Sequence, residues 1–280
     1  MAEVAGQSVR YGQVNLEYGM ELATTKPADD GPIWMVNLMS YRERADYADG
    51  RAADISGREA DDRYAPLGPL AAVGAEPVFL ADVESQLHND SPTWHRVGIV
   101  KYPTRRSFIE MQQRPDFKEL HAHKEAGMAT TIVMGCLPMP LPDPYTGAPA
   151  LAEFTRTRAH ADPTVVVVHA VRFHDHSRQS ELAAYTDRAA ATPDGGRITA
   201  CMRVEGTILG DGRSWDEVRF EVFPSSESFM TTVVDAERDG AHTAKRESAV
   251  ADSYTLVTRP VIDRLHASLE GHHAPYPSQP

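Results

Sequence analysis

Cysteine, basic residues and long apolar runs are all scarce in this chain of 280 residues. The two cysteines, Cys136 and Cys201, stand in no CxxC or other metal-ligand spacing, which predicts buried, unreactive thiols in a reducing compartment. No run approaches the roughly 18 apolar residues that a membrane-spanning helix needs. The first 20 residues lack a basic start followed by an apolar run, so no signal peptide is expected and the predicted location is cytoplasmic.

The charge balance is acidic, with 28 Lys and Arg residues against 40 Asp and Glu residues and a net charge of −12. Clustered basic side chains bind phosphate backbones and anionic membrane surfaces, and only Arg105 and Arg106 form a dense basic cluster here. Neither nucleic acid nor a membrane is therefore expected as a partner. Nucleotide-binding glycine motifs and the GxSxG, HExxH and Cys–His arrangements are also missing, which argues against nucleotide binding and against serine or cysteine hydrolysis.

An internal repeat is the most informative feature that is present. The segment Trp94–Lys124 returns as Trp215–Lys245, 121 positions later and without a gap. The matched positions include Trp94/Trp215, Val97/Val218, Pro103/Pro224, Phe108/Phe229, His121/His242 and Lys124/Lys245. A repeat of this length indicates one structural unit used twice, and the hydrophobic content of 41% is sufficient for packed units.

The first copy lies in a segment whose patterns predict the order strand, helix, strand, strand, helix, strand. The strands are expected over residues 33–39, 77–83, 96–102 and 130–134. Ser56 begins the first helix with the form of a capping box, and Pro66 predicts a kink or an early stop. Thr104 is the expected N-cap of the second helix, which Pro115 restarts.

The second copy repeats this order, with strands over 164–173, 198–209, 218–223 and 254–258 and helices over 178–191 and 225–250. Such an order is typical of the split βαβ, ferredoxin-like pattern. The predicted fold class is therefore α+β, with two tandem ferredoxin-like (βαββαβ) units. The expected divisions are an extended N-terminal arm (1–30), the first unit (31–136), a proline-rich linker (137–162), the second unit (163–260) and a C-terminal tail (261–280) that is expected to be disordered from His266.

Three short segments carry a resemblance to a known family: Val36-Asn37-Leu38 in the first strand, Tyr102-Pro103-Thr104 after the third, and Phe108 in the following helix. On these residues the unit resembles the dimeric α/β-barrel superfamily, and within it the DUF1330-type unit. The resemblance covers residues 30–136 well and 163–260 more loosely. Units of this kind pair sheet to sheet as homodimers, so two of them in one chain imply a dimeric α/β barrel formed within the chain.

The superfamily that the chain resembles includes cofactor-free monooxygenases, haem-degrading enzymes, other haem proteins, aldoxime dehydratases, lactone isomerases and polyketide cyclases. The fold alone therefore does not select a chemistry. In the small haem-degrading members, a helical His ligates iron beside a strand-one Asn, an aromatic residue ending strand three, and a Phe. The matching positions are His121, Asn37, Tyr102 and Phe108, with Tyr in place of the Trp of those enzymes. The second unit offers Phe223, Phe229 and His242, with Val168 or His169 in place of the Asn.

His121 is the leading candidate for chemistry because it shares a helical stripe with Phe117 and Lys124. A neutral imidazole suits proton transfer near pH 7, and the alternative is a half-buried histidine bonded to a backbone carbonyl. His123 points to the opposite side of the same helix, so the two histidines are not expected to share a metal, and no metal site is predicted. Lys124 either binds an anion in the pocket or keeps a solvated head.

Three other polar residues and one histidine pair each have two possible roles. Asn37 either orients a ligand or bonds a neighbouring loop, and Tyr102 either packs or donates its hydroxyl to a substrate. His169 stands in a very apolar strand and either packs there or lines a second cavity. The His174–His176 pair after that strand either meets water or supports a surface metal.

The predicted function is a cofactor-independent enzyme that acts on a small, largely apolar organic molecule. His121 would move a proton while Asn37 and Tyr102 hold an oxygen where charge develops, in a lyase, isomerase, cyclase or oxygenase reaction. Substrate-binding roles are expected for Lys124, Phe108, Met111, His169 and His242. The alternatives are a haem protein with His121 or His242 as axial ligand, and a non-catalytic protein that binds a small ligand. The expected arm and the acidic surface permit a homodimer.

Overall fold

The computed structural model describes residues 8–141, 164–174, 196–238 and 240–272, with the backbone alone at 8, 235–238, 240–242 and 245. Its centre is a closed barrel of eight strands in the order β8-β6-β3-β5-β4-β10-β7-β9, which the pairing of β9 with β8 completes. The strands are β3 (Ile33–Tyr41), β4 (Glu76–Leu87), β5 (Arg96–Tyr102), β6 (Met128–Pro138), β7 (Val165–Phe173), β8 (Arg197–Gly210), β9 (Glu217–Phe223) and β10 (Val250–Asp263). The predicted α+β class is confirmed.

The two halves of the barrel have the same strand order, fourth, first, third, second: β6-β3-β5-β4 and β10-β7-β9-β8. The halves join edge to edge, through β4 with β10 and through β6 with β8, and both seams are antiparallel. Backbone donors and acceptors of each half are therefore satisfied by the other half. The expectation of a barrel formed within one chain is borne out by this pairing.

Side chains along β3 alternate between the barrel interior and its outer face. Trp34, Val36 and Leu38 are fully buried in one cluster to which all eight strands contribute. Because neighbours on a strand point to opposite faces, Met35 and Asn37 project outward, toward the helices. Each buried aliphatic side chain stabilises the fold by about 1.5–3 kcal/mol, so the interior is a packed core.

The sequence repeat is structural in both copies. Trp94 and Trp215 are both buried in the barrel core, and their rings lie 5.4 Å and 5.3 Å from the ring of Tyr254. The Thr104 and Ser225 side chains each accept a hydrogen bond, of 3.0 Å, from the backbone N–H three residues on. The repeated tryptophans therefore pack in the barrel core in both copies.

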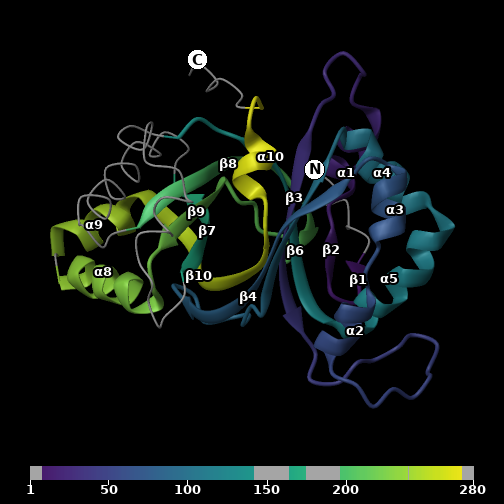
Figure 1. Ribbon diagram of the computed structural model, residues 1–280, viewed down its shortest axis with the longest axis horizontal. Coiled ribbons are helices and arrows are strands. Elements are labelled where there is room, and N and C mark those ends of the chain that lie inside the picture. The colour runs from purple at the N-terminus through teal and green to yellow at the C-terminus, as the bar shows by residue number, and fades with distance from the viewer. Residues whose placement is uncertain (1–7, 142–163, 175–195, 239, 273–280) are drawn as a thin grey trace, which may run out of the picture.

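Helices cover two opposite sides of the barrel (Figure 1). One side carries α2 (Gly57–Arg63), α3 (Leu67–Ala72), α4 (Arg105–Gln113) and α5 (Pro115–Gly127), and the other carries α8 (Ser226–Arg238) and α9 (Gly240–Ala249). The capping box at Ser56 is present, with Glu59 as its partner. The helix that begins there ends before Pro66 and a new one starts at Leu67, as the predicted break requires.

The N-terminal region corrects the prediction of an extended arm. It contains β1 (Ser8–Val9), β2 (Gly12–Val14) and α1 (Leu16–Thr24), and β2 pairs with β8. Tyr18 lies directly on Gly135 and Gly206, where an added Cβ would come within 2.1 Å of its hydroxyl oxygen and 2.5 Å of its ring, respectively. Tyr18 and Leu22 are the buried residues of α1 and stand one turn apart. That spacing is the helical signal that the polar composition of the region obscured.

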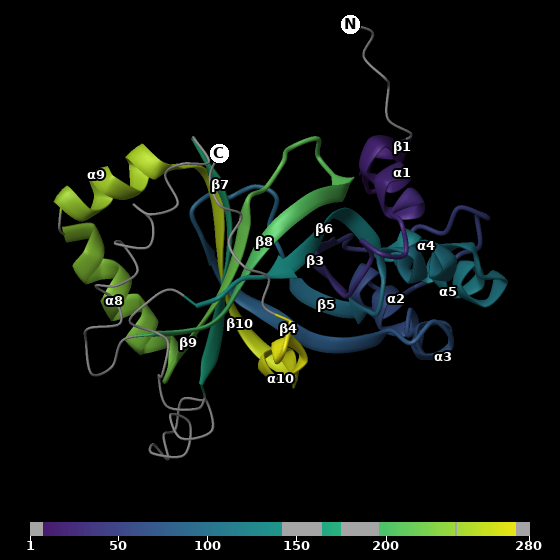
Figure 2. The ribbon, with the colours of Figure 1, turned by 90° about the horizontal axis from the view of Figure 1, so that it is seen from above.

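The C-terminal region also differs from the prediction of a disordered tail. Strand β10 continues to Asp263, and α10 (Leu265–Leu269) follows at one end of the barrel (Figures 1 and 2). Leu265 and Leu269 are buried in the barrel core, and the Trp34 indole donates a 2.9 Å hydrogen bond to Ser268 Oγ. Residues 261–272 therefore belong to the folded structure because they cover apolar side chains that the barrel end would otherwise expose.

Other boundaries shift without changing the order of elements. Strands β4 and β10 are longer than predicted, and β6 continues to Pro138, inside the expected linker. The rest of that linker and the helix predicted over 178–191 lie outside the described residues. Within the described part of the chain, no helix is both long enough and apolar enough to cross a membrane.

Close backbone contact between α2 and α5 gives a stability prediction. A Cβ at Gly127 would lie 2.3 Å from the Gly57 carbonyl oxygen, so Gly127→Ala should push the helices apart. We expect a loss of about 1–3 kcal/mol in the free energy of unfolding, measured by urea titration. Gly68→Ala is the control, since nothing lies within 4 Å of its added methyl. Equal stability of the two variants would contradict the contact.

Candidate active site

A cavity of about 610 Å³ lies between the outer face of the first-half strands and the helices that cover them. Aromatic and aliphatic side chains form most of its wall: Tyr11, Met35, Met39, Tyr64, Leu70 and Phe117 among others. Six of the residues predicted for the site also line it: Asn37, Tyr102, Phe108, Met111, His121 and Lys124. The structure therefore brings together the predicted residues of the first half around one cavity.

Gly98 provides room at the floor of this cavity. It pairs with Asn37 in the β3–β5 ladder and, like Asn37, lines the cavity, but it has no side chain to fill it. A Cβ built at Gly98 would lie 3.1 Å from the terminal methyl of Met39 and 3.6 Å from Leu80. Any larger residue at this position would therefore take volume directly from the cavity.

His121, on α5, is held in the wall by aromatic neighbours. Its Nε2 lies 2.9 Å from the Tyr11 hydroxyl, and its ring lies 5.2 Å from the ring of Phe117 and 6.1 Å from that of Tyr64. Burial, and to a smaller extent the nearby Lys124 ammonium, lowers the pKa of His121 to about 4. The imidazole is therefore neutral at pH 7, which is the protonation state of a general base.

Lys124 stands one turn further along α5. Its Nζ donates a 3.3 Å hydrogen bond to Asn37 Oδ1 and lies 5.3 Å from the centre of the Tyr64 ring. The side chain as a whole is partly exposed, but burial of the ammonium end lowers the pKa of Lys124, an effect that the Asp61 carboxylate opposes. The other end of the Asn37 amide donates to the Met35 carbonyl at 2.9 Å, so this amide orients the lysine.

Tyr102 closes the opposite wall. Its hydroxyl donates to Met111 Sδ at 3.6 Å, and its ring meets that of Phe108 edge to face at 5.3 Å. The residue is only 3% exposed, and burial raises the pKa of its hydroxyl. Tyr102 therefore packs against its neighbours, and its hydroxyl donates its hydrogen bond to a sulfur atom, which is a weak acceptor.

A buried charged cluster forms the polar end of the cavity. The Arg96 guanidinium bonds to Asp61, Asp62 and Asp82 at 3.2, 2.8 and 3.1 Å, and Tyr41 donates to Asp61 at 2.7 Å. Arg96 is 8% and Asp61 6% exposed, so removing one partner would leave a buried charge at a cost of about 3–5 kcal/mol. This network ties α2 to β4 and β5 and thereby holds one wall in place.

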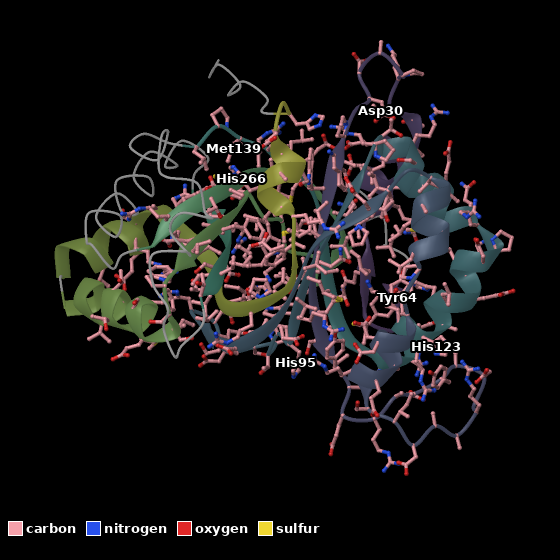
Figure 3. The ribbon with its side chains drawn as sticks, viewed as in Figure 1. Asp30, Tyr64, His95, His123, Met139 and His266 are labelled. Atoms are coloured by element: carbon pink, nitrogen blue, oxygen red, sulfur yellow. The ribbon has the colours of Figure 1, made fainter. Side chains whose placement is uncertain are left out.

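Sequence reasoning missed Tyr11, Tyr64 and the Arg96 cluster. Tyr11 stands in the region predicted to be an extended arm, and Tyr64 stands at the break after α2. No short motif identifies any of them, because each reaches the cavity from a different element. Figure 3 places Tyr64 among the helices beside the first-half strands.

The outer face of the second half is built differently. His169 occupies the register position of Asn37, since Asn37 pairs with Gly98 and His169 pairs with Arg219, the repeat counterpart of Gly98. Arg219 bonds to Glu217, and both are buried, so charged side chains take the room that Gly98 leaves open. The His169 ring contacts Thr255 Oγ1 at 3.1 Å and a Glu221 oxygen at 3.4 Å, and it does not line the cavity.

Of the remaining histidine candidates, His123 does not line the cavity. His123 bonds to the Tyr47 hydroxyl at 2.6 Å, and Figure 3 shows it near the outer end of this helical side. The side chain of His242 and the whole of His176 lie outside the described residues. Across the described side chains, no group of three or more His, Cys, Asp or Glu residues could hold a metal ion.

Comparisons with known proteins add no family assignment. No protein-family model and no curated protein matches the chain. Among solved structures, a protein of unknown function from Rhodopseudomonas palustris is 25% identical, covers 45% of this chain and 94% of its own, and has a TM-score of 0.38.

Two other solved structures cover most of the chain. An anthrone oxidase-like protein is 13% identical, covers 86% of this chain and 98% of its own, and has a TM-score of 0.47. A chlorite dismutase variant from Candidatus Nitrospira defluvii is 11% identical, covers 87% and 95%, and has a TM-score of 0.45. Because all three TM-scores are low, these likenesses by themselves indicate neither a family nor an activity.

The lowered pKa of His121 predicts acid sensitivity. An unfolded histidine titrates near 6.5 and the folded one at about 4, so between these values only the unfolded chain binds the proton. The stability that the fold gains by burying His121 in its neutral form is therefore complete above pH 6.5. It is lost as the pH falls toward 4. From pH 7 to 4.5, wild type should lose roughly 2 kcal/mol more unfolding free energy than His121→Asn, measured by urea titration. Equal losses would contradict the pKa.

Gly98 gives a second prediction, on binding. Gly98→Val should weaken binding of the neutral apolar dye N-phenyl-1-naphthylamine by roughly ten-fold, because the added methyl groups occupy the cavity floor. Gly98→Ala should have a smaller effect, and Gly31→Ala, with open space around its Cβ, should have none. Fluorescence titration measures all three, and unchanged affinity in Gly98→Val would place the dye elsewhere.

Proposed function

We propose that the protein is an enzyme that moves a proton on a small, largely apolar organic molecule held in the first-half cavity. The observation that carries this proposal is the pairing of a neutral His121 with the Tyr11 hydroxyl at 2.9 Å on the wall of that cavity. With its pKa lowered to about 4, His121 is unprotonated at pH 7 and available to accept a proton, but it is a weaker base than a free imidazole, so the transfer depends on stabilisation of the anion that forms.

In the proposed reaction, one ring nitrogen of His121 takes a proton from a C–H or O–H bond of the substrate. The bonding electrons stay on the substrate, which becomes an enolate or a phenolate. The Tyr11 hydroxyl at Nε2 determines which ring nitrogen is free to accept, and Lys124 stabilises the negative oxygen that forms. This first step is common to lyase, isomerase, cyclase and cofactor-free oxygenase reactions.

Stabilisation of the oxygen is assigned to Lys124 because of its hydrogen-bonding capacity. The Tyr102 hydroxyl is directed at Met111, and the Asn37 amide already bonds to Met35 and Lys124. An ammonium group has three donors, and only the bond to Asn37 uses one of them among the described residues. Asn37 then acts as the residue that positions Lys124.

We also propose that the two barrel halves, over residues 31–136 and 163–260, are tandem ferredoxin-like units of the dimeric α/β-barrel type. Their identical strand order and their edge-to-edge pairing support this assignment. The DUF1330-type resemblance rests on the residues around Asn37, Tyr102 and Phe108, which the structure places at one cavity. A homodimer, the other association expected from the sequence, is testable by light scattering.

The haem alternative fits the site less well. Nε2 of His121 faces the Tyr11 hydroxyl at 2.9 Å, and the ring lies against Phe117, so axial ligation through this nitrogen requires Tyr11 to move. The side chain of His242 lies outside the described residues. Haem would supply redox chemistry, and a Soret band of the purified protein is its direct test.

Proton transfer at His121 is testable before the natural substrate is known. The protein is incubated in D₂O with a panel of enolisable ketones and phenols, and exchange of carbon-bound hydrogen for deuterium is followed by NMR. His121→Asn should reduce the exchange rate by roughly 10²–10⁴-fold, the usual contribution of a general base.

His123→Asn is the matched control, since His123 lies on the same helix but outside the cavity and should leave exchange unchanged. Retention of exchange in His121→Asn, or its equal loss in both variants, would refute the assignment. If His121→Asn binds an exchanging compound of the panel with normal affinity but does not exchange its hydrogen, the loss is one of catalysis and not of binding.

A further inference from the structure

We infer that the cavity takes a planar, largely apolar molecule that carries one anionic oxygen group, and that Lys124 binds this group. Carboxylates and ionised enols or phenols share the required chemistry. The inference rests on the proposed function only in taking the first-half cavity as the substrate site. It adds the charge and shape of the ligand, which general-base chemistry at His121 leaves open.

The surroundings of Lys124 carry the first part of the argument. Within the described residues, no carboxylate lies at salt-bridge distance from Nζ, and its hydrogen-bond acceptor is the neutral Asn37 amide at 3.3 Å. The Tyr64 ring face covers one further side, at 5.3 Å. A buried ammonium is costly unless it is paired and hydrogen-bonded, and two of its three donors are left for a ligand.

The other charged side chains at the cavity already form ion pairs and hydrogen bonds with one another. Asp61 accepts from Arg96 at 3.2 Å and from Tyr41 at 2.7 Å, and it acts on Lys124 only at longer range. Arg96 is surrounded by three carboxylates, so its guanidinium does not offer an anion site. Lys124 is therefore the cation at this cavity that an incoming oxyanion can reach without breaking an ion pair.

The wall composition indicates the shape of the ligand. Flat rings of Tyr64, Phe108 and Phe117 line the cavity together with the adaptable thioethers of Met35 and Met111. Aromatic faces and polarisable sulfur favour a planar, conjugated partner over a compact aliphatic one. A volume of about 610 Å³ also exceeds the needs of a single acetate-sized anion.

Among the described residues, the second half does not repeat the room that Gly98 provides in the first. In the second half, Arg219 stands where Gly98 leaves room, and it is bonded to Glu217. His169, at the position of Asn37, contacts Thr255 and Glu221. A saturating ligand should therefore bind the full chain with a stoichiometry of one.

Two dyes that differ by one charged group provide the test. 8-Anilinonaphthalene-1-sulfonate and N-phenyl-1-naphthylamine share their ring system, but only the first carries an anion. Fluorescence titration of the full-length protein should show one site and a preference for the anionic dye of about ten-fold or more, as expected for a charge-assisted hydrogen bond. Lys124→Gln should abolish this preference while leaving the affinity for the neutral dye within about two-fold, and Lys124→Arg should restore most of it.

Lys118→Gln is the matched control, because Lys118 is an exposed residue of the same helix outside the cavity. Equal affinity of wild type for the two dyes overturns the inference, and this comparison does not depend on any variant folding. A preference that persists in folded Lys124→Gln, checked by circular dichroism, overturns it as well. Either result leaves proton transfer at His121 standing, since that assignment fails if deuterium exchange survives in His121→Asn or is lost equally in His123→Asn.

Discussion

The filled interior of the barrel is the constraint on which the rest of the structure depends. All eight strands direct apolar side chains inward, and the two repeated tryptophans close around Tyr254. A core packed in this way excludes a ligand, and the cavity formed by the described residues lies on the outer face, beneath the helices. The strand pairs β4–β10 and β6–β8 join the halves in a fixed hydrogen-bonding register, so one half cannot rotate against the other. This register fixes the direction in which each outer face points.

On the first outer face, polar contacts hold the helices in place around an open space. The Arg96 cluster ties α2 to two strands, and the backbone contact of Gly57 with Gly127 brings the start of α2 against the end of α5. Both helices carry residues of the cavity, Asp61 on the first and His121 on the second. The geometry of the site therefore depends on contacts that take no part in the proposed proton transfer.

His121 and Lys124 influence one another because they stand three residues apart on α5. The lysine charge helps to keep the imidazole neutral, and the neutral imidazole adds no repulsion to a buried ammonium. Base and cation thus occupy adjacent positions without competing for the same proton. The second half uses the same backbone for a different purpose, since Arg219 and Glu217 fill with charge the room that Gly98 leaves open.

The sequence by itself determined the order of elements, the duplication and six residues of the cavity, because alternation, capping residues and a gap-free repeat are local properties of the chain. It did not show that Tyr11 and Tyr64 reach His121, that the N-terminal region packs on Gly135 and Gly206, or that α10 covers the barrel end. Those contacts join residues far apart in the chain, and no local pattern encodes a distance between them. Only the closed barrel decided that the cavity lies outside the core and that one half, with glycine at its floor, has room for a ligand.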